Sequence, residues 1–326
     1  MRRRTFITLL GGTAACWPLA VRAQQTKMPL IGFLSMGSGG SRANFFVDAF
    51  RKGLAESGYI EDKNVTIEYR WAAKYSELPT LAMELIDRQV TILVASPLSG
   101  GFAAKAATKT VPIVFASGGD PVEAGLVDSL NHPGGNITGI SEMAFQIVPK
   151  RFQYLRDLIP GAAIFAMLIN PDARSAASAS AAALAAAQAL SVQVHFLNVK
   201  SSEDLPRVFQ MLSELRADAF LVTPDAVFNN EREQVLTLAA RYHVPGIYPE
   251  RLWVTSGGLI SYGSSIPGVF HQMGLYTGRI LKGEKPGDLP IQQPTAFDLV
   301  INLKTARALG LSVPSTLLTI ADEVIE

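Results

Sequence analysis

Residues 112–141 read PIVFASGGDPVEAGLVDSLNHPGGNITGIS and bring a strand, a glycine-rich turn and a helix signature together in one stretch. The apolar run at 112–116 is typical of a buried parallel strand. Ser117, Gly118 and Gly119 follow it, and the two glycines let the backbone approach a ligand with its N–H groups free to donate. Because open α/β sheets bind small molecules where a strand ends in such a turn, this stretch predicts a binding loop.

Asp120 follows the glycines and carries a helix-start signature, with Pro121 next and Glu123 in the capping-box position. An N-cap aspartate contributes about 1 kcal/mol to its helix, and that role alone would explain the residue. The same carboxylate could also face a cleft and bind a ligand ammonium group. Both interpretations stay open, and they are compatible.

Two further loops of small residues follow apolar strands in the first half of the chain, at 35–41 and 96–101. The strands and helices around them alternate, and right-handed crossovers return each parallel strand to the same side of the sheet. We therefore expect the loops at 35–41, 96–101 and 117–120 to gather at one sheet edge.

The alternation of strands and helices restarts after residue 149. The short extended runs at 137–141 and 259–263 are interpreted as crossings between lobes, with a third crossing near 284–295. The apolar stripe of the helix at 266–282 predicts packing on the first lobe. The predicted fold class is α/β, with two doubly wound parallel-sheet lobes joined by three crossings. The predicted ranges are 28–138 plus 257–284 for lobe I, and 139–256 plus 285–326 for lobe II.

Polar and aromatic residues at these strand ends and crossings are the candidate ligand-binding residues. Serine and threonine hydroxyls can donate to a ligand carboxylate or carbonyl, although capping a local helix is their commoner role. Asp225 is either a cleft residue or a solvated loop charge, and Tyr262 either stacks on a flat ligand or packs in the core or hinge. Tyr69 and Trp71 are interpreted as core residues. The candidate set is Ser35, Ser96, Ser117, Gly118, Gly119, Asp120, Asn170, Thr223, Asp225 and Tyr262.

The N-terminus has the form of an export signal. Arg2, Arg3 and Arg4 precede an uncharged stretch at 6–20 that is too short to span a bilayer comfortably. We expect cleavage after Ala23, so that residues 1–23 are a signal peptide and the mature protein lies in the periplasm. A twin-arginine signal and an ordinary secretory signal fit equally well, and lipidation of Cys16 is a further alternative.

Composition argues against several classes of function. Residues 1–23 hold four arginines and no acidic residue, so the net charge of +1 becomes −3 in the mature chain, which disfavours a nucleic-acid partner. Cys16 is the only cysteine, so the mature chain has no disulfide and no thiol nucleophile. The four histidines lack metal-ligand spacing, and no catalytic or phosphate-loop motif is present. We therefore predict no catalytic residue, metal or cofactor, and a mature protein that does not span a membrane.

Four sequence blocks resemble a known family. They are residues 58–70 (GYIEDKNVTIEYR), 112–115 with 119–127 (PIVF and GDPVEAGLV), 133–139 (PGGNITG), and 297–306 with 308–310 (FDLVINLKTA and ALG). In this order they resemble the ABC transporter substrate-binding proteins related to the tryptophan- and tyrosine-binding type. The resemblance implies a type I periplasmic-binding-protein fold, a ligand between two lobes, and delivery to an ABC permease and its ATPase.

The expected function is therefore capture of a small molecule, such as an aromatic amino acid or a related small organic solute, by a protein that we expect to be a monomer. Two alternatives stay open. An exported α/β enzyme could act on a small molecule in the same cleft, and a receptor could present its ligand to a membrane sensor.

Overall fold

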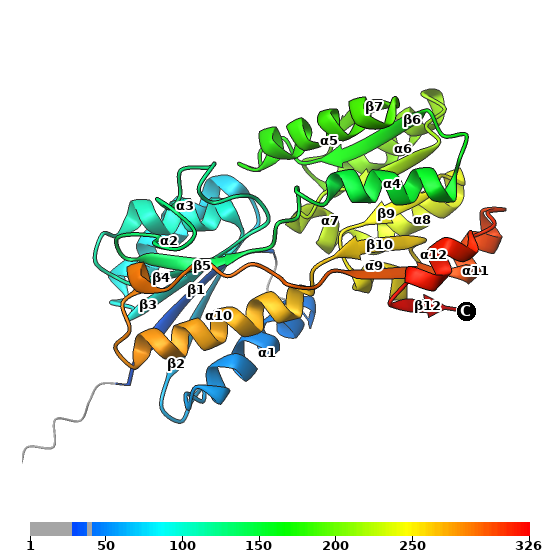
Figure 1. Cartoon of the computed structure of the whole chain (residues 1–326). Helices are drawn as coiled ribbons and strands as arrows, with labels where there is room; N and C mark the ends of the chain where they lie inside the picture. Colours follow the sequence, from blue (N-terminus) through cyan, green and yellow to red (C-terminus); the bar gives the residue numbers. More distant parts are fainter. Residues whose placement is uncertain (1–27, 38–40) are drawn as a thin grey trace, which may run out of the picture.

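The computed structural model describes residues 28–37 and 41–326. The predicted signal peptide, Cys16 and the loop residues 38–40 lie outside the described residues. Within the described part, the chain forms two α/β lobes, each built on its own sheet (Figure 1).

The first lobe contains a parallel sheet with the strand order β2-β1-β3-β4-β5. Its central strands are buried on both faces, as the continuous apolar runs predict. The strands are β1 (Leu30–Met36), β2 (Thr66–Ala72), β3 (Ile92–Ala95), β4 (Ile113–Ser117) and β5 (Ile137–Ser141).

Helices cover both faces of this sheet, which makes the lobe doubly wound. On one face, α1 packs against α10, and both glycines at their contact are required by close backbone approach. A Cβ atom on Gly53 would lie 2.0 Å from the His271 carbonyl oxygen, and one on Gly274 would lie 2.2 Å from the Phe50 carbonyl oxygen. The helices are α1 (Ser41–Glu56), α2 (Leu78–Asp87), α3 (Leu98–Ala107) and α10 (Ile266–Leu281), with short 3-10 turns η1 (Tyr75–Glu77) and η3 (Pro286–Asp288).

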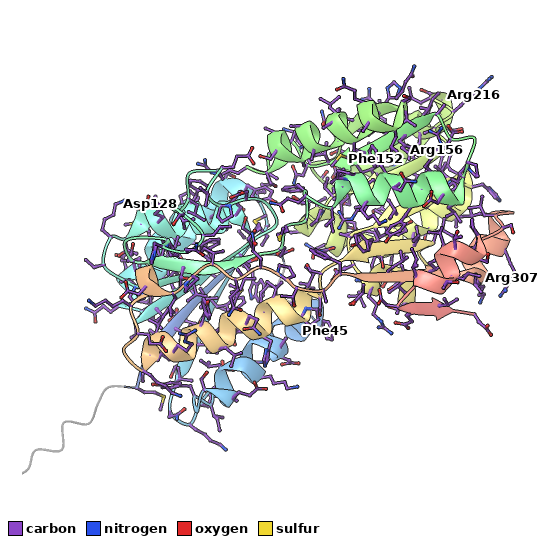
Figure 2. The ribbon with its side chains drawn as sticks, in the orientation of Figure 1. Phe45, Asp128, Phe152, Arg156, Arg216 and Arg307 are labelled. Carbon is purple, nitrogen blue, oxygen red and sulfur yellow. The ribbon has the colours of Figure 1, made fainter. Side chains whose placement is uncertain are left out.

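The second lobe contains a larger sheet with the order β12-β11-β10-β9-β8-β6-β7, in which only the β10–β11 pair is antiparallel. Figure 2 shows Phe152 of α4 inside this lobe, and its ring meets Phe165 of β6 edge-on at 5.3 Å between centroids. The strands are β6 (Ile164–Ile169), β7 (Gln193–Asn198), β8 (Ala219–Val222), β9 (Gly246–Tyr248), β10 (Ile260–Gly263), β11 (Asp298–Asn302) and β12 (Glu323–Ile325).

Separate apolar clusters fill the two faces of the second sheet, with α4 and α5 over one face and α6 and α8 over the other. The second lobe is therefore doubly wound as well. Its helices are α4 (Val148–Leu158), α5 (Ala176–Leu190), α6 (Leu205–Glu214), α7 (Ala226–Asn230), α8 (Arg232–Tyr242), α9 (Arg251–Thr255), α11 (Leu303–Ala308) and α12 (Ser315–Ile320), with the 3-10 turn η2 (Ser202–Asp204).

Three connections join the lobes, but two of them lie beside the residues that the sequence suggested. The run 137–141 is β5, which pairs with β4 in the first sheet, and the run 259–263 contains β10 of the second sheet. Both runs carry buried isoleucines and pair within a sheet. They are therefore strands, and the chain changes lobe after each of them. The third connection follows Gln292, whose backbone still bonds to Gly139 and Ser141 of the first lobe.

The helix expected after Asp120 is also absent. Residues 121–125 form successive turns, and the chain then runs irregularly to β5. The prediction that α10 packs on the first lobe is confirmed by its contacts with α1 and its buried residues in the first-lobe core.

Candidate ligand-binding site

A cavity of about 420 Å³ lies between the two lobes. All five strands of the first sheet contribute to it, because each strand ends at its wall. The residues at or just after those strand ends are Met36, Trp71, Ser96, Gly118 and Glu142, in the chain order of β1 to β5. The second lobe closes the cavity with residues that follow β6 and β8, including Ala173, Ser175, Pro224 and Asp225.

Aromatic rings form one wall of this cavity. Phe46 of α1 stacks on Phe270 of α10 with a centroid distance of 5.3 Å and an interplanar angle of 21°. Trp71 at the end of β2 lies beside them, and Phe33 packs behind both Trp71 and Phe270 at 5.7 and 6.2 Å. Phe145 adds a further ring to the cavity lining. Phe33 is buried in the core and supports this aromatic wall from behind.

A polar contact between the lobes closes one side of the cavity. The Tyr75 hydroxyl donates a 2.6 Å hydrogen bond to Asp225 Oδ2. Asp225 Oδ1 accepts from the Val227 backbone N–H at 2.8 Å and from Asn170 Nδ2 at 3.3 Å. Burial raises the pKa of Asp225, while these three hydrogen bonds act in the opposite direction. Both oxygens of Asp225 are therefore already engaged within the protein.

Arg174 makes a second contact across the gap. Its guanidinium lies 4.2 Å from the centroid of the Phe102 ring, and its backbone N–H donates to Ser99 Oγ at 3.5 Å. Phe102 and Ser99 belong to α3 of the first lobe, whereas Arg174 lies in the second-lobe loop between β6 and α5. Two contacts between the lobes therefore lie close to the cavity.

Glu142 is an acidic residue at the cavity wall that the sequence analysis did not single out. It follows β5 directly, at the start of the first connection between lobes. Burial raises the pKa of Glu142 to about 7, and the charge of Arg151 opposes that rise only in part. Glu142 is half-buried and belongs to the lining of the cavity.

Arg151 of α4 is buried, and its guanidinium bonds to backbone carbonyls at or beside two of the connections between the lobes. Its Nε donates to the Tyr262 carbonyl at 2.7 Å, and its Nη2 donates to the Pro249 carbonyl at 3.3 Å. A longer contact of 3.5 Å joins Nη1 to the carbonyl of Ala144 in the first connection. Burial lowers the pKa of Arg151 to about 10, although Glu142 and Tyr262 favour the charged form.

The chain is similar to known proteins over most of its length. A family model described as ABC transporter substrate binding protein matches residues 36–325. The chain belongs to this family. The resemblance found in the sequence is thereby confirmed, as are the two-lobed type I periplasmic-binding-protein fold and a solute-binding role for small molecules.

The relatives of this substrate-binding protein include characterised and structurally known members. A tyrosine-binding protein of Clostridioides difficile (strain R20291) is 27% identical over 267 residues, which are 80% of this chain and 75% of the relative. A Streptococcus pneumonia protein solved in complex with L-Trp is 26% identical, with a TM-score of 0.82 over 91% of this chain and 99% of its own. A conserved domain protein of Vibrio cholerae is 25% identical, with a TM-score of 0.85 over 91% of this chain and 100% of its own.

The structure of the substrate-binding protein brings part of the candidate set together. Ser35, Ser96, Gly118 and Asp225 line the main cavity. Gly119 and Asp120 line a smaller neighbouring pocket of about 100 Å³, which shares Leu98, Phe145 and Ser175 with the main cavity. Asn170 and Thr223 line a third pocket of about 10 Å³ together with Asp225.

Ser117 and Tyr262 are absent from the residues lining these three cavities, although both are described by the structure. The Ser117 hydroxyl is buried and donates to the Gly119 carbonyl at 2.8 Å, so it shapes the loop from within. The Tyr262 ring packs in the second lobe, edge-on to Tyr154 at 5.1 Å and tilted against Phe297 at 5.8 Å.

Asp120 has a local role that replaces the expected helix cap. Its Oδ1 accepts from the backbone N–H groups of Val122 and Glu123 at 2.8 and 3.2 Å, which is the hydrogen-bond pattern of a capped turn. The signature read from the sequence is therefore present, although no helix continues from it. Trp71, interpreted as a core residue, packs on Phe33 and also lines the cavity.

Across residues 28–37 and 41–326, no His, Cys, Asp or Glu cluster of three or more is placed to hold a metal ion. In the same part of the chain, no helix has the length and apolar character needed to cross a membrane.

Proposed function

We propose that this substrate-binding protein captures an aromatic amino acid, or a closely related small solute, and delivers it to an ABC permease and its ATPase. The observation that carries the proposal is the cavity of about 420 Å³ between the lobes, which is lined by Trp71 and by stacked Phe46 and Phe270. Its size falls within the range of about 300–1,000 Å³ that small-molecule sites occupy. The tyrosine-binding relative and the neighbour solved with L-Trp support the same ligand class.

We propose that capture occurs by closure of the two lobes about their three connections. The connecting segments are residues 142–147, 264–265 and 293–297, which follow β5, β10 and the Gln292 bridge. Closure would form the Tyr75–Asp225 hydrogen bond and the Arg174–Phe102 contact described above. Hinge motions of this kind pass through a few residues between rigid bodies. Ligand choice would then depend on groups that both lobes contribute to the closed cavity.

We further propose that the protein is exported through its N-terminal segment, acts as a monomer, and releases its solute chemically unchanged. The small, polar and aromatic residues around the cavity support a binding role, because they can pack on a solute and donate hydrogen bonds to it. The distinction from an exported enzyme is direct. Purified protein incubated with its ligand should return that ligand intact, and formation of a new product would contradict this part of the proposal.

The test uses the chain from residue 24 onward, unfolded and refolded to remove any co-purifying solute. Melting temperature and calorimetric titration are measured with tyrosine, tryptophan and phenylalanine, and with aliphatic amino acids and sugars for comparison. A ligand that binds only the folded protein adds about 2.7 kcal/mol of stability at a hundredfold excess over Kd. We expect such stabilisation from at least one aromatic amino acid. Stabilisation by sugars or aliphatic amino acids alone would overturn the assignment.

A further inference from the structure

We propose that the Glu142 carboxylate is the site that binds a positively charged amino group of the ligand, so that this cavity selects aromatic amines more strictly than it selects carboxylates. This inference deepens the proposed function and rests on it.

The backbone holds Glu142 at a fixed point of the cavity wall. Its N–H donates to the Ser117 carbonyl at 2.7 Å, and the N–H of Ala144 donates to the Gly118 carbonyl at 2.9 Å. These bonds fasten the start of the first connection to the glycine-rich loop after β4. The side chain therefore projects from a rigid corner between Gly118 and Phe145, both of which line the cavity.

The carboxylate of Glu142 has no hydrogen-bond partner among the described residues, in contrast with the carboxylate of Asp225. Asp225 receives three hydrogen bonds and ties the lobes together, so its oxygens are occupied. The charge of Arg151 acts on Glu142, but the guanidinium of Arg151 donates to the carbonyls of Tyr262, Pro249 and Ala144. An ionised carboxylate that lacks a close partner in a partly dry cavity is costly, and a ligand ammonium group would remove that cost.

The other titratable groups around the cavity also favour a ligand ammonium group. Asp225 and Glu231 line the second-lobe side of the cavity and Tyr75 lines the first-lobe side. Arg151 is buried outside the lining, and its charge acts on Glu142. Among the described lining residues there is no lysine, arginine or histidine. Serine hydroxyls such as those of Ser96 and Ser99 could donate to a ligand carboxylate, whereas a ligand ammonium group would meet a full opposite charge at Glu142. Hydrogen bonds that involve two charged groups are roughly twice as strong as neutral ones.

Protonation of Glu142 provides an independent signature. Because burial raises the pKa of Glu142 to about 7, the empty protein holds a proton on this carboxyl in slightly acidic solution. An ammonium ligand binds the ionised form, so binding releases that proton and lowers the pKa. Affinity for an amine should therefore weaken by up to tenfold for each pH unit below about 7 and level off above it.

The first arm of the test compares three ligands that share one ring. They are tyrosine, tyramine, which lacks the carboxylate, and 3-(4-hydroxyphenyl)propionate, which lacks the amine. We expect the deaminated acid to bind at least about thirtyfold more weakly than tyrosine, which is the lower limit for losing one partner of a buried charge pair. Tyramine should lose less affinity than the deaminated acid. Equal binding of tyrosine and the deaminated acid would overturn the inference while leaving the proposed function intact.

The second arm uses Glu142→Gln, with Glu123→Gln as a control that neutralises an exposed carboxylate outside the cavity. We expect Glu142→Gln to weaken tyrosine and tyramine at least about thirtyfold at pH 8, to abolish the pH dependence of their affinity, and to leave the deaminated acid unaffected. Unchanged tyrosine affinity and an unchanged pH profile in Glu142→Gln would contradict the inference. The melting temperature of each variant shows whether it is folded.

Failure of the proposed function would look different, since no aromatic ligand would then bind the wild-type protein. The inference about Glu142 would in that case be tested with choline, putrescine and agmatine, by the melting-temperature shift in wild type and in Glu142→Gln. A shift present in wild type and lost in Glu142→Gln supports the cation site without the aromatic assignment. The absence of any such shift would overturn the inference too.

Discussion

The Tyr75 hydroxyl donates a 2.6 Å hydrogen bond to Asp225 Oδ2 and thereby joins two lobes through residues that are 150 positions apart in sequence. The donor comes from the turn before α2, and the acceptor caps α7 with its other oxygen. This one bond therefore links a first-lobe turn to the start of a second-lobe helix, through two residues that both line the cavity.

Removal of this hydroxyl should weaken ligand binding by destabilising the closed arrangement of the lobes. We expect Tyr75→Phe to lower affinity by about tenfold, because a hydrogen bond to a charged group contributes about 1.5–3 kcal/mol and part of it is regained from water. Calorimetric titration measures the affinity, and small-angle scattering measures the compaction on ligand addition. Tyr59→Phe is the control, since Tyr59 lies in the first lobe away from the cavity lining. Equal losses in both variants would contradict an interlobe role.

The aromatic wall offers a matched pair of neighbours on α1. Phe46 lines the cavity and stacks on Phe270, whereas Phe45 is 51% exposed and does not line it. Figure 2 shows Phe45 near the end of α1 that faces the second lobe. We expect Phe46→Ala to reduce aromatic-ligand affinity at least about tenfold, because ring stacking and burial are lost together. Phe45→Ala should stay within about threefold of wild type, and a larger loss there would argue against the assigned wall.

The raised pKa of Glu142 should also affect how the stability of the empty protein depends on pH. Burial raises the folded pKa of Glu142 from the ordinary value of 4.5 to about 7, so its contribution to folding is fully present below about pH 4.5 and is lost as pH rises through about 7. We expect Glu142→Gln to gain stability relative to wild type between pH 5 and pH 8, as measured by urea unfolding at several pH values. A constant difference across that window would mean that the carboxyl titrates normally.

The junction of β10 with α10 should tolerate no side chain at Gly263. A Cβ atom there would lie 1.8 Å from the Pro249 carbonyl oxygen and 3.3 Å from Arg151 Nη2. We expect Gly263→Ala to destabilise the protein by about 1–3 kcal/mol or more, since backbone beside a buried arginine must shift. Gly161→Ala is the control, because nothing lies within 4 Å of a Cβ atom at that exposed position. Thermal unfolding of both variants against wild type makes the comparison.

Much of the fold could be predicted from the sequence, because apolar runs such as 112–116 and 164–169 must be buried on both sides. Their small-residue ends then had to meet at a sheet edge, and Ser35, Ser96 and Gly118 do line one cavity. The run 137–141 was harder. It follows a Pro-Gly-Gly break and has the length of a connection, and only its pairing with β4 makes it the last strand of the sheet.

The site could be predicted only in part. The pattern of a strand does not show which of its residues lie in the core and which line a cavity at the end of the strand. Trp71 alternates with charged residues just as core aromatics do. It is nevertheless the second-last residue of β2, and its side chain lines the cavity. Glu142 was hidden by the same difficulty, since its importance depends on β5 ending one residue before it. Asp120 shows the converse: its turn formed from local hydrogen bonds, but no partner surface extended that turn into a helix.

The packing of α10 on α1 has a consequence for how the protein is made. The first lobe is incomplete until residue 281 has been synthesised, because the interlocked glycines at Gly53 and Gly274 come from opposite halves of the gene product. Neither lobe corresponds to a continuous piece of chain, so neither can be completed early during translation. A ribosome must deliver nearly the whole polypeptide before either half reaches its final architecture.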